Sequence, residues 1–206
     1  LYLLSDSFSE IILISGSLLL GFPIPVLPAQ IIWINLITDG FPSFALTLEP
    51  GEKEVMKDKP RKRKAKILDK EMKILIFVIG IFTDLILLVV FWLMLKSGQY
   101  ELNYIRTFIF AALGLDSLFY VFSCRSLRHT ILTKNPFSNK ALNIGVLIGL
   151  GLQMLAIYAT PFQKLFDTVP LGVKAWIIIV LLGLIEIVAI ETVKYYFIIK
   201  RRTKEV

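Results

Sequence analysis

Six long apolar stretches constrain the fold of this chain more than any other feature of its sequence. Each approaches the roughly 20 helical residues that are needed to cross a bilayer core of about 30 Å. They cover residues 1–21, 29–48, 72–95, 104–122, 141–159 and 175–199. Because these stretches are continuously apolar and do not alternate, they indicate helices and not barrel strands. The sequence therefore predicts an all-α membrane protein, in which residues 1–206 form a single transmembrane domain, a bundle of six transmembrane helices.

The composition supports this class and narrows the metal chemistry. Apolar residues make up 56% of the chain and charged residues 19%, and the mean hydropathy of +0.72 is well above that of a soluble domain. Cys124 is the only cysteine and His129 the only histidine, so an internal disulfide and a Cys/His site for zinc or haem are not expected. Any metal site must use oxygen ligands.

The distribution of Lys and Arg predicts the orientation in the membrane. Nine lie in residues 49–71, four in residues 124–140 and four in the tail from residue 200, against four in the connections on the other side. Because short cytoplasmic loops collect basic residues, we expect loops 49–71 and 123–140 and both termini to be cytoplasmic. The basic run 60–66 also suits contact with anionic lipids of the bilayer. A nucleic-acid partner is not expected, because the positive charge lies in loops that flank the membrane.

Polar residues inside the first two spans suggest an ion site. Asn35, Thr38 and Asp39 share one face of a regular helix, and Ser7 and Glu10 share a face of the preceding helix. The connection between the two spans is short, so these faces can converge. Carboxylate, amide and hydroxyl oxygens are the ligands of a hard cation such as Ca²⁺, and Mn²⁺, Na⁺ and protons stay open. Hydrogen bonding between helices is the alternative role.

The second span contains a helix-breaking sequence directly after Asp39. Gly40 loosens the helix, and Pro42 removes the backbone donor that would pair with the carbonyl of residue 38. Interrupted membrane helices offer backbone carbonyls as extra ligands. We therefore predict that the second helix is broken near Gly40–Pro42, beside the candidate ion site.

These residues resemble a known family. The stretch from Trp33, WINLITDGFPSFALTLEP, is similar to the sixth transmembrane helix of P-type cation-transporting ATPases of the calcium-pump-like branch, and the stretch from Tyr2, YLLSDSFSEIIL, to the fifth. Later stretches resemble the helices that follow, in the expected order: FSCRSLR, NPFSN, FDTVPLG and ETVK. The resemblance implies the carboxy-terminal membrane domain, helices five to ten, of an ATP-driven cation pump. ATP and Mg²⁺ would bind only to the missing part of that pump, whose amino-terminal helices and cytoplasmic domains would be partners of this chain.

The resemblance also implies roles for individual residues. Family positions that bind the transported ion match four residues here: Glu10, Asn35, Thr38 and Asp39. Ser7 stands where two-site calcium pumps have an asparagine. The position of a carboxylate on the eighth helix falls on Ser117, with Asp116 one residue before it. One residue is about 100° of helix rotation, so Asp116 would face the site only if the helix turns or unwinds.

Four further features have simpler interpretations. Asp84 and Glu186 lie near the middle of their spans, where a protonated or locally paired acid is expected. A proton-bearing role in counter-transport is the alternative. Glu191 and Lys194 are three residues apart and predict an ion pair. The glycines at positions 145 and 149 predict a small-residue packing face.

The chain lacks the residues that hydrolyse ATP. It contains no Asp-Lys-Thr-Gly-Thr sequence, no glycine-rich nucleotide loop and no Ser/His/Asp triad. Because it begins at Leu1 within an apolar stretch, we expect it to be a fragment of a longer protein, and its compact loops favour a bacterial plasma membrane. The alternatives are a stand-alone six-helix channel or secondary transporter, and a structural membrane module.

Overall fold

The computed structural model describes most of the chain. It covers residues 2–51, 72–73, 76–77, 80–126, 129–131, 133 and 135–196. The expectations for the basic loop over residues 52–71 and for the tail over residues 197–206 lie outside these residues.

The described residues form helices and connections, with no strand among them. The α-helices are α1 (Tyr2–Leu19), α2 (Pro28–Trp33), α3 (Gly40–Leu46), α5 (Gly80–Ser97), α6 (Leu102–Cys124), α7 (Lys140–Tyr158), α8 (Thr160–Phe166) and α9 (Val173–Lys194). A π-helical segment, η1 (Ile34–Thr38), joins α2 to α3, and a short 3₁₀ helix, η4 (Pro136–Ser138), precedes α7. Within the described residues, four helices are long and apolar enough to cross a membrane: α1, α6, α7 and α9. The predicted helical membrane class is confirmed, whereas the count of six spans is not.

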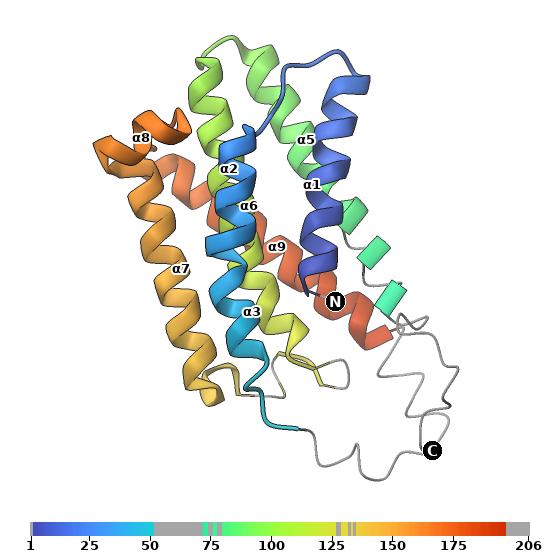
Figure 1. Cartoon of the computed structure of the whole chain (residues 1–206). Coiled ribbons are helices and arrows are strands. Elements are labelled where there is room, and N and C mark those ends of the chain that lie inside the picture. Colours follow the sequence, from blue (N-terminus) through green and yellow to red (C-terminus); the bar gives the residue numbers. More distant parts are fainter. Residues whose placement is uncertain are drawn as a thin grey trace.

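Helix α6 forms the centre of the bundle. In its most apolar window 78% of the residues are buried, against 28–33% in α1, α7 and α9. Figure 1 shows α6 behind the α2–η1–α3 helix, with α7 on one side, α1 and α5 on the other, and α9 crossing behind at a steep angle. The outer helices expose large apolar side chains such as Ile11, Leu147 and Leu181. Such an outer surface suits contact with lipid or with further helices.

The second predicted span is interrupted, one turn earlier than predicted. The backbone N–H of Asp39 donates to the carbonyl of Ile34 at 2.9 Å, which is the i→i−5 bond of a π-turn. Gly40 and Pro42 instead lie in the first turn of α3. Proline is tolerated there because the first N–H groups of a helix have no partner inside the helix. The helix therefore widens into a π-turn just before Asp39, and it is not broken after Asp39.

The glycine face of α7 packs against this interrupted helix. A Cβ atom at Gly145 would lie 3.1 Å from the carbonyl oxygen of Phe41. A Cβ atom at Gly149 would lie 2.9 Å from Leu118 Cδ2 and 3.7 Å from the carbonyl oxygen of Thr38. The predicted small-residue face is thus confirmed, and its partner is the backbone on either side of Asp39.

We expect Gly145→Val to lower the free energy of unfolding by about 1–3 kcal/mol, because the added side chain meets backbone that cannot move aside. Gly151→Val is the matched control in the same helix, since a Cβ there has nothing within 4 Å. Denaturant titration of the intact protein in detergent, followed by tryptophan fluorescence, measures both. Equal effects of the two substitutions would contradict close packing of α7 on the interrupted helix.

One ion pair ties α3 to the ends of α6 and α7, and a second lies within α9. Arg125 binds Glu49 through two hydrogen bonds of 2.9 and 3.0 Å, and Asn139 donates to the same carboxylate at 2.8 Å. At the end of α9, Lys194 lies 2.7 Å from Glu191, which confirms the predicted pair. The interrupted helix is therefore anchored to α6 and α7 just beyond its last turn.

Candidate cation-binding site

Two of the predicted ligands meet between α1 and η1. The Asn35 side chain donates through Nδ2 to both carboxylate oxygens of Glu10, each at 2.8 Å, and to the carbonyl of Ile31 at 3.0 Å. Glu10 is buried. The amide nitrogen thus occupies the place at the carboxylate that a cation would take. Cation binding here requires Asn35 to turn its oxygen toward the ion.

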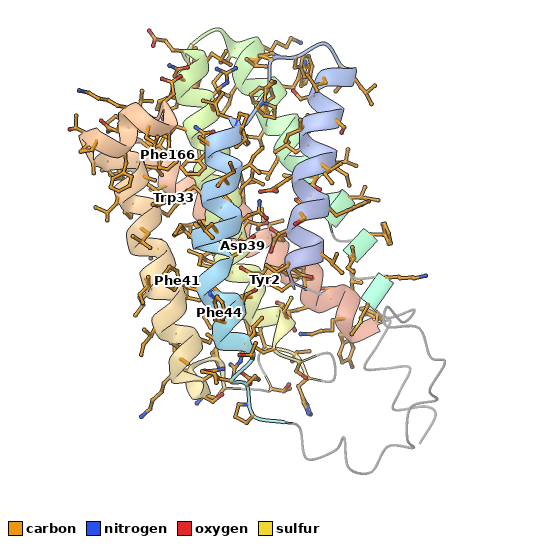
Figure 2. All side chains as sticks on the ribbon, viewed as in Figure 1. Tyr2, Trp33, Asp39, Phe41, Phe44 and Phe166 are labelled. Carbon is orange, nitrogen blue, oxygen red and sulfur yellow. The ribbon has the colours of Figure 1, made fainter. Side chains whose placement is uncertain are left out.

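Asp39 is fully buried, directly after the π-turn. Its Oδ1 atom accepts hydrogen bonds from the Ser117 hydroxyl on α6 and from the Tyr2 hydroxyl at 3.4 Å, and these two hydroxyls lie 2.6 Å apart. Its Oδ2 atom has no hydrogen-bond partner among the described residues. Figure 2 shows Asp39 and Tyr2 between α1 and the interrupted helix. An unpaired buried carboxylate oxygen is costly, so this atom is suited to a positively charged ligand.

Thr38 faces away from this pair of acids. Its hydroxyl donates to Gln153 of α7 at 3.4 Å, and Gln153 donates in turn to the carbonyl of Phe110 at 3.2 Å. The prediction that Asn35, Thr38 and Asp39 share one face assumed a regular helix, and the π-turn changes their angular positions. The structure therefore brings Glu10 to Asn35 and Asp39 to Ser117, while the Thr38 hydroxyl contacts α7.

Two further predicted ligands do not join the site within this chain. Ser7 is exposed, because it lies about 60° beyond Glu10, which already stands at the edge of the buried face of α1. Asp116 lines a separate cavity with Glu186 of α9. The next residue, Ser117, contacts Asp39 in its place, as a rotation of about 100° per residue requires.

The structure adds acids that the sequence did not assign to the site. The Ser9 hydroxyl donates to the fully buried Asp84 of α5, so the expected local pairing of Asp84 is confirmed. Asp84 Oδ2 and Asp6 Oδ2 are buried without a hydrogen-bond partner in the described part of the chain, like Asp39 Oδ2. Helical spacing in the sequence could have found Asp6 and Ser9, since both lie on the same side of α1 as the buried Tyr2.

Carboxylates alone do not complete a metal site here. In the ranges that the structure describes, no three Asp, Glu, His or Cys side chains come close enough to hold a metal ion together. The donor set around Glu10 and Asp39 nevertheless consists of carboxylate, amide and hydroxyl oxygens, which suits a hard cation. A cation at this site would therefore need neutral oxygens or groups from outside this chain.

Comparison with known proteins decides the family. A family model described as "Cation transporting ATPase, C-terminus" matches residues 23–196. The chain belongs to this family. As a cation-transporting ATPase C-terminus with several apolar helices, it is an integral, multi-pass membrane protein.

Relatives of this cation-transporting ATPase C-terminus come from bacteria, fungi and animals. It is 36% identical over 183 residues to the calcium-transporting ATPase of Bacillus subtilis (strain 168). The aligned region covers 87% of this chain and 20% of that protein. It is 32% identical to calcium-transporting ATPase 1 of Schizosaccharomyces pombe, over 83% of this chain and 19% of the relative. It is 34% identical to human calcium-transporting ATPase type 2C member 1, over 91% of this chain and 20% of that relative. The chain thus spans about one fifth of the length of these relatives.

Proposed function

We propose that this chain is the membrane part of an ATP-driven Ca²⁺ pump and that Glu10, Asn35 and Asp39 bind the transported ion. The observation that carries the proposal is the fully buried Asp39, placed at a helix interruption with one carboxylate oxygen unpaired. Interrupted membrane helices are a recurrent way to build ion sites. The relatives named above as calcium-transporting ATPases support Ca²⁺ as the cargo.

Neutral oxygens would complete the shell around the ion. Ca²⁺ takes six to eight oxygen ligands. The proline at position 42 removes the donor that would pair with the carbonyl of Thr38, so this carbonyl is one candidate. The Thr38 hydroxyl would join only if it turned from Gln153 of α7 toward the ion. Ser7, on the exposed flank of α1, would contribute only if another part of the parent protein covers that flank.

The remaining functions belong to parts of the pump that this chain does not include. The relatives are about five times longer than the matched region, so ATP and Mg²⁺ are proposed to bind elsewhere in the parent protein. Further helices would cover the exposed side of α1, where Leu3, Leu4 and Ile11 lie. We place both termini in the cytoplasm and the protein in a bacterial plasma membrane, surrounded by lipid, on the basis of its basic segments and compact loops.

Transport would follow from two arrangements of the same ligands. In one, Asn35 turns its oxygen inward and joins Glu10 and Asp39 around a dehydrated ion. In the other, the Asn35 amide donates a hydrogen bond to Glu10 and the Ser117 hydroxyl donates one to Asp39, as in the present structure. Phosphorylation of the parent protein would favour the second arrangement and so lower the affinity for the ion.

The test is Ca²⁺ uptake into inverted membrane vesicles that contain the intact protein. We expect ⁴⁵Ca²⁺ to accumulate when ATP is added and to leak out when a calcium ionophore follows. Accumulation that needs no nucleotide would instead favour a channel or secondary transporter, and no accumulation of any cation would contradict the proposal.

A further inference from the structure

A buried glutamine of α7 holds the hydroxyl of a residue next to Asp39. Gln153 is 1% exposed, and its side-chain oxygen accepts a hydrogen bond from the Thr38 hydroxyl at 3.4 Å. Thr38 is fully buried and is the last residue of η1. Among the described residues, the Thr38 side chain makes no other hydrogen bond. The direction in which this hydroxyl points therefore depends on α7 and not on its own helix.

The central helix α6 fixes the amide of Gln153 in place. The Nε2 atom of Gln153 donates to the carbonyl of Phe110 at 3.2 Å. Gly114, one turn further along α6, leaves room for this amide, since a Cβ atom there would lie 2.9 Å from both Cδ and Nε2 of Gln153. A carbonyl can only accept, so the amide nitrogen must face Phe110 and the amide oxygen is left for Thr38. The acceptor for the Thr38 hydroxyl is therefore held in a fixed position.

The glycine face of α7 brings Gln153 to the interrupted helix. Gly145, Gly149 and Gln153 are four residues apart along α7 and so share one face of that helix. A Cβ atom at Gly149 would lie 3.7 Å from the carbonyl oxygen of Thr38, so the two helices approach closely there. One turn further along, Gln153 is the polar residue of this face, and it meets the same threonine through its side chain.

The hydrogen bond between Thr38 and Gln153 is weak enough to be exchanged. Hydroxyl hydrogen bonds in proteins are usually about 2.7–2.8 Å long, and the bond here measures 3.4 Å. The hydroxyl can thus leave this acceptor for another partner at a small cost. Asn35 is held in a comparable way, because its amide donates to Glu10 where a cation would bind. The present structure therefore shows two neutral groups of the proposed ion shell bonded to protein atoms.

We propose that Gln153 is a positioning residue, which holds the Thr38 hydroxyl away from the ion between Glu10 and Asp39 and so lowers the affinity for Ca²⁺. Ion binding requires this hydroxyl to leave Gln153, and the free energy of the lost hydrogen bond counts against binding. Release is favoured for the same reason, because the acceptor on α7 stays in place. The inference rests on the proposed function, since it assigns Thr38 to the shell of that ion.

The test is equilibrium binding of ⁴⁵Ca²⁺ to the intact protein in detergent, without nucleotide. Gln153→Met removes the acceptor and keeps an unbranched side chain of similar size. We expect this variant to bind Ca²⁺ about 3–10-fold more tightly than the wild type, which is the effect of one neutral hydrogen bond. Gln153→Leu removes the same acceptor with a different shape and should act alike. Damage to the fold would weaken binding, so it cannot produce this gain.

Thr38→Val separates positioning from packing. Valine keeps the shape of threonine without its hydroxyl, so Thr38→Val alone should weaken Ca²⁺ binding. In that background Gln153→Met should change the affinity by less than about twofold, because no hydroxyl is left to hold. Gln30→Met is the control, since Gln30 is also a fully buried amide, but it bonds to Phe166 and Leu27. It should leave the affinity for Ca²⁺ unchanged.

The outcomes separate this inference from the proposed function. A wild-type protein that binds no Ca²⁺ would contradict the proposed function and, with it, the role of Gln153. A wild type that binds Ca²⁺, together with unchanged or weaker binding in both Gln153 variants, would overturn the role of Gln153 alone. An equal gain from Gln153→Met with and without the Thr38 hydroxyl would also overturn it, because the effect would then not pass through Thr38.

Discussion

Asp39→Asn is expected to lower the affinity for Ca²⁺ by at least ~100-fold. Removing a side chain that only orients a metal ligand already lowers metal affinity by about 10–100-fold, and removing a charged ligand itself should cost more. The substitution keeps the size of the side chain, and its oxygen can still accept the hydrogen bonds from Tyr2 and Ser117. What it removes is the charge at the unpaired Oδ2 position. Ca²⁺-dependent phosphorylation of the intact protein by ATP, titrated against free Ca²⁺, measures the change.

A matched control separates this effect from a general loss of structure. Asp167 is exposed after α8, accepts a hydrogen bond from Asn103 at 3.2 Å and has a left-handed backbone (φ 53°), which asparagine also adopts readily. Asp167→Asn should therefore leave Ca²⁺ dependence unchanged. If Asp39→Asn retained wild-type affinity and turnover, Asp39 would not be a ligand. Glu10→Gln tests the other half of the site in the same assay.

Sequence reasoning reached the helical class and the polar residues, because both depend on local pattern. Long apolar runs specify helices in a membrane, and an acid within such a run needs a partner. The pairing of Glu10 with Asn35 followed from the short connection between their helices. None of these inferences required knowledge of how distant segments pack.

What sequence reasoning could not reach was the rotation of each helix. The π-turn at Ile34–Thr38 turns the Thr38 hydroxyl toward α7, and a regular helix model has no means to predict it. The exposure of Ser7 depends on how α1 is rotated toward its neighbours, and the choice between Asp116 and Ser117 as the residue that faces Asp39 depends on the rotation of α6. Such angles are set by contacts between distant residues, such as Gly145 against Phe41, and not by spacing along the chain.

Arg125→Met is expected to lower the free energy of unfolding by about 3–5 kcal/mol, the usual cost of removing one partner of a buried ion pair. The Arg125 side chain is 3% exposed, and its guanidinium donates two hydrogen bonds to Glu49. It also donates to two backbone carbonyls before α7, at 3.0 and 2.9 Å, and to the Ser138 hydroxyl at 2.6 Å. Its loss would remove this cation from the Glu49 carboxylate, whose side chain is 11% exposed. Denaturant titration of the intact protein in detergent measures the change.

The same substitution near the other end of α6 provides the control. Among the described residues, Arg106 makes one hydrogen bond, an exposed one to the carbonyl of Ile24 at 3.0 Å, so Arg106→Met should cost no more than about 0.5–1.5 kcal/mol. Arg125→Met combined with Glu49→Met should be less destabilising than Arg125→Met alone, because both charges of the pair are then removed together. Additive effects would show that the two side chains act separately. A strong coupling would mean that α3 is held by the ends of α6 and α7, so that movement of this end is transmitted along the interrupted helix to Asp39.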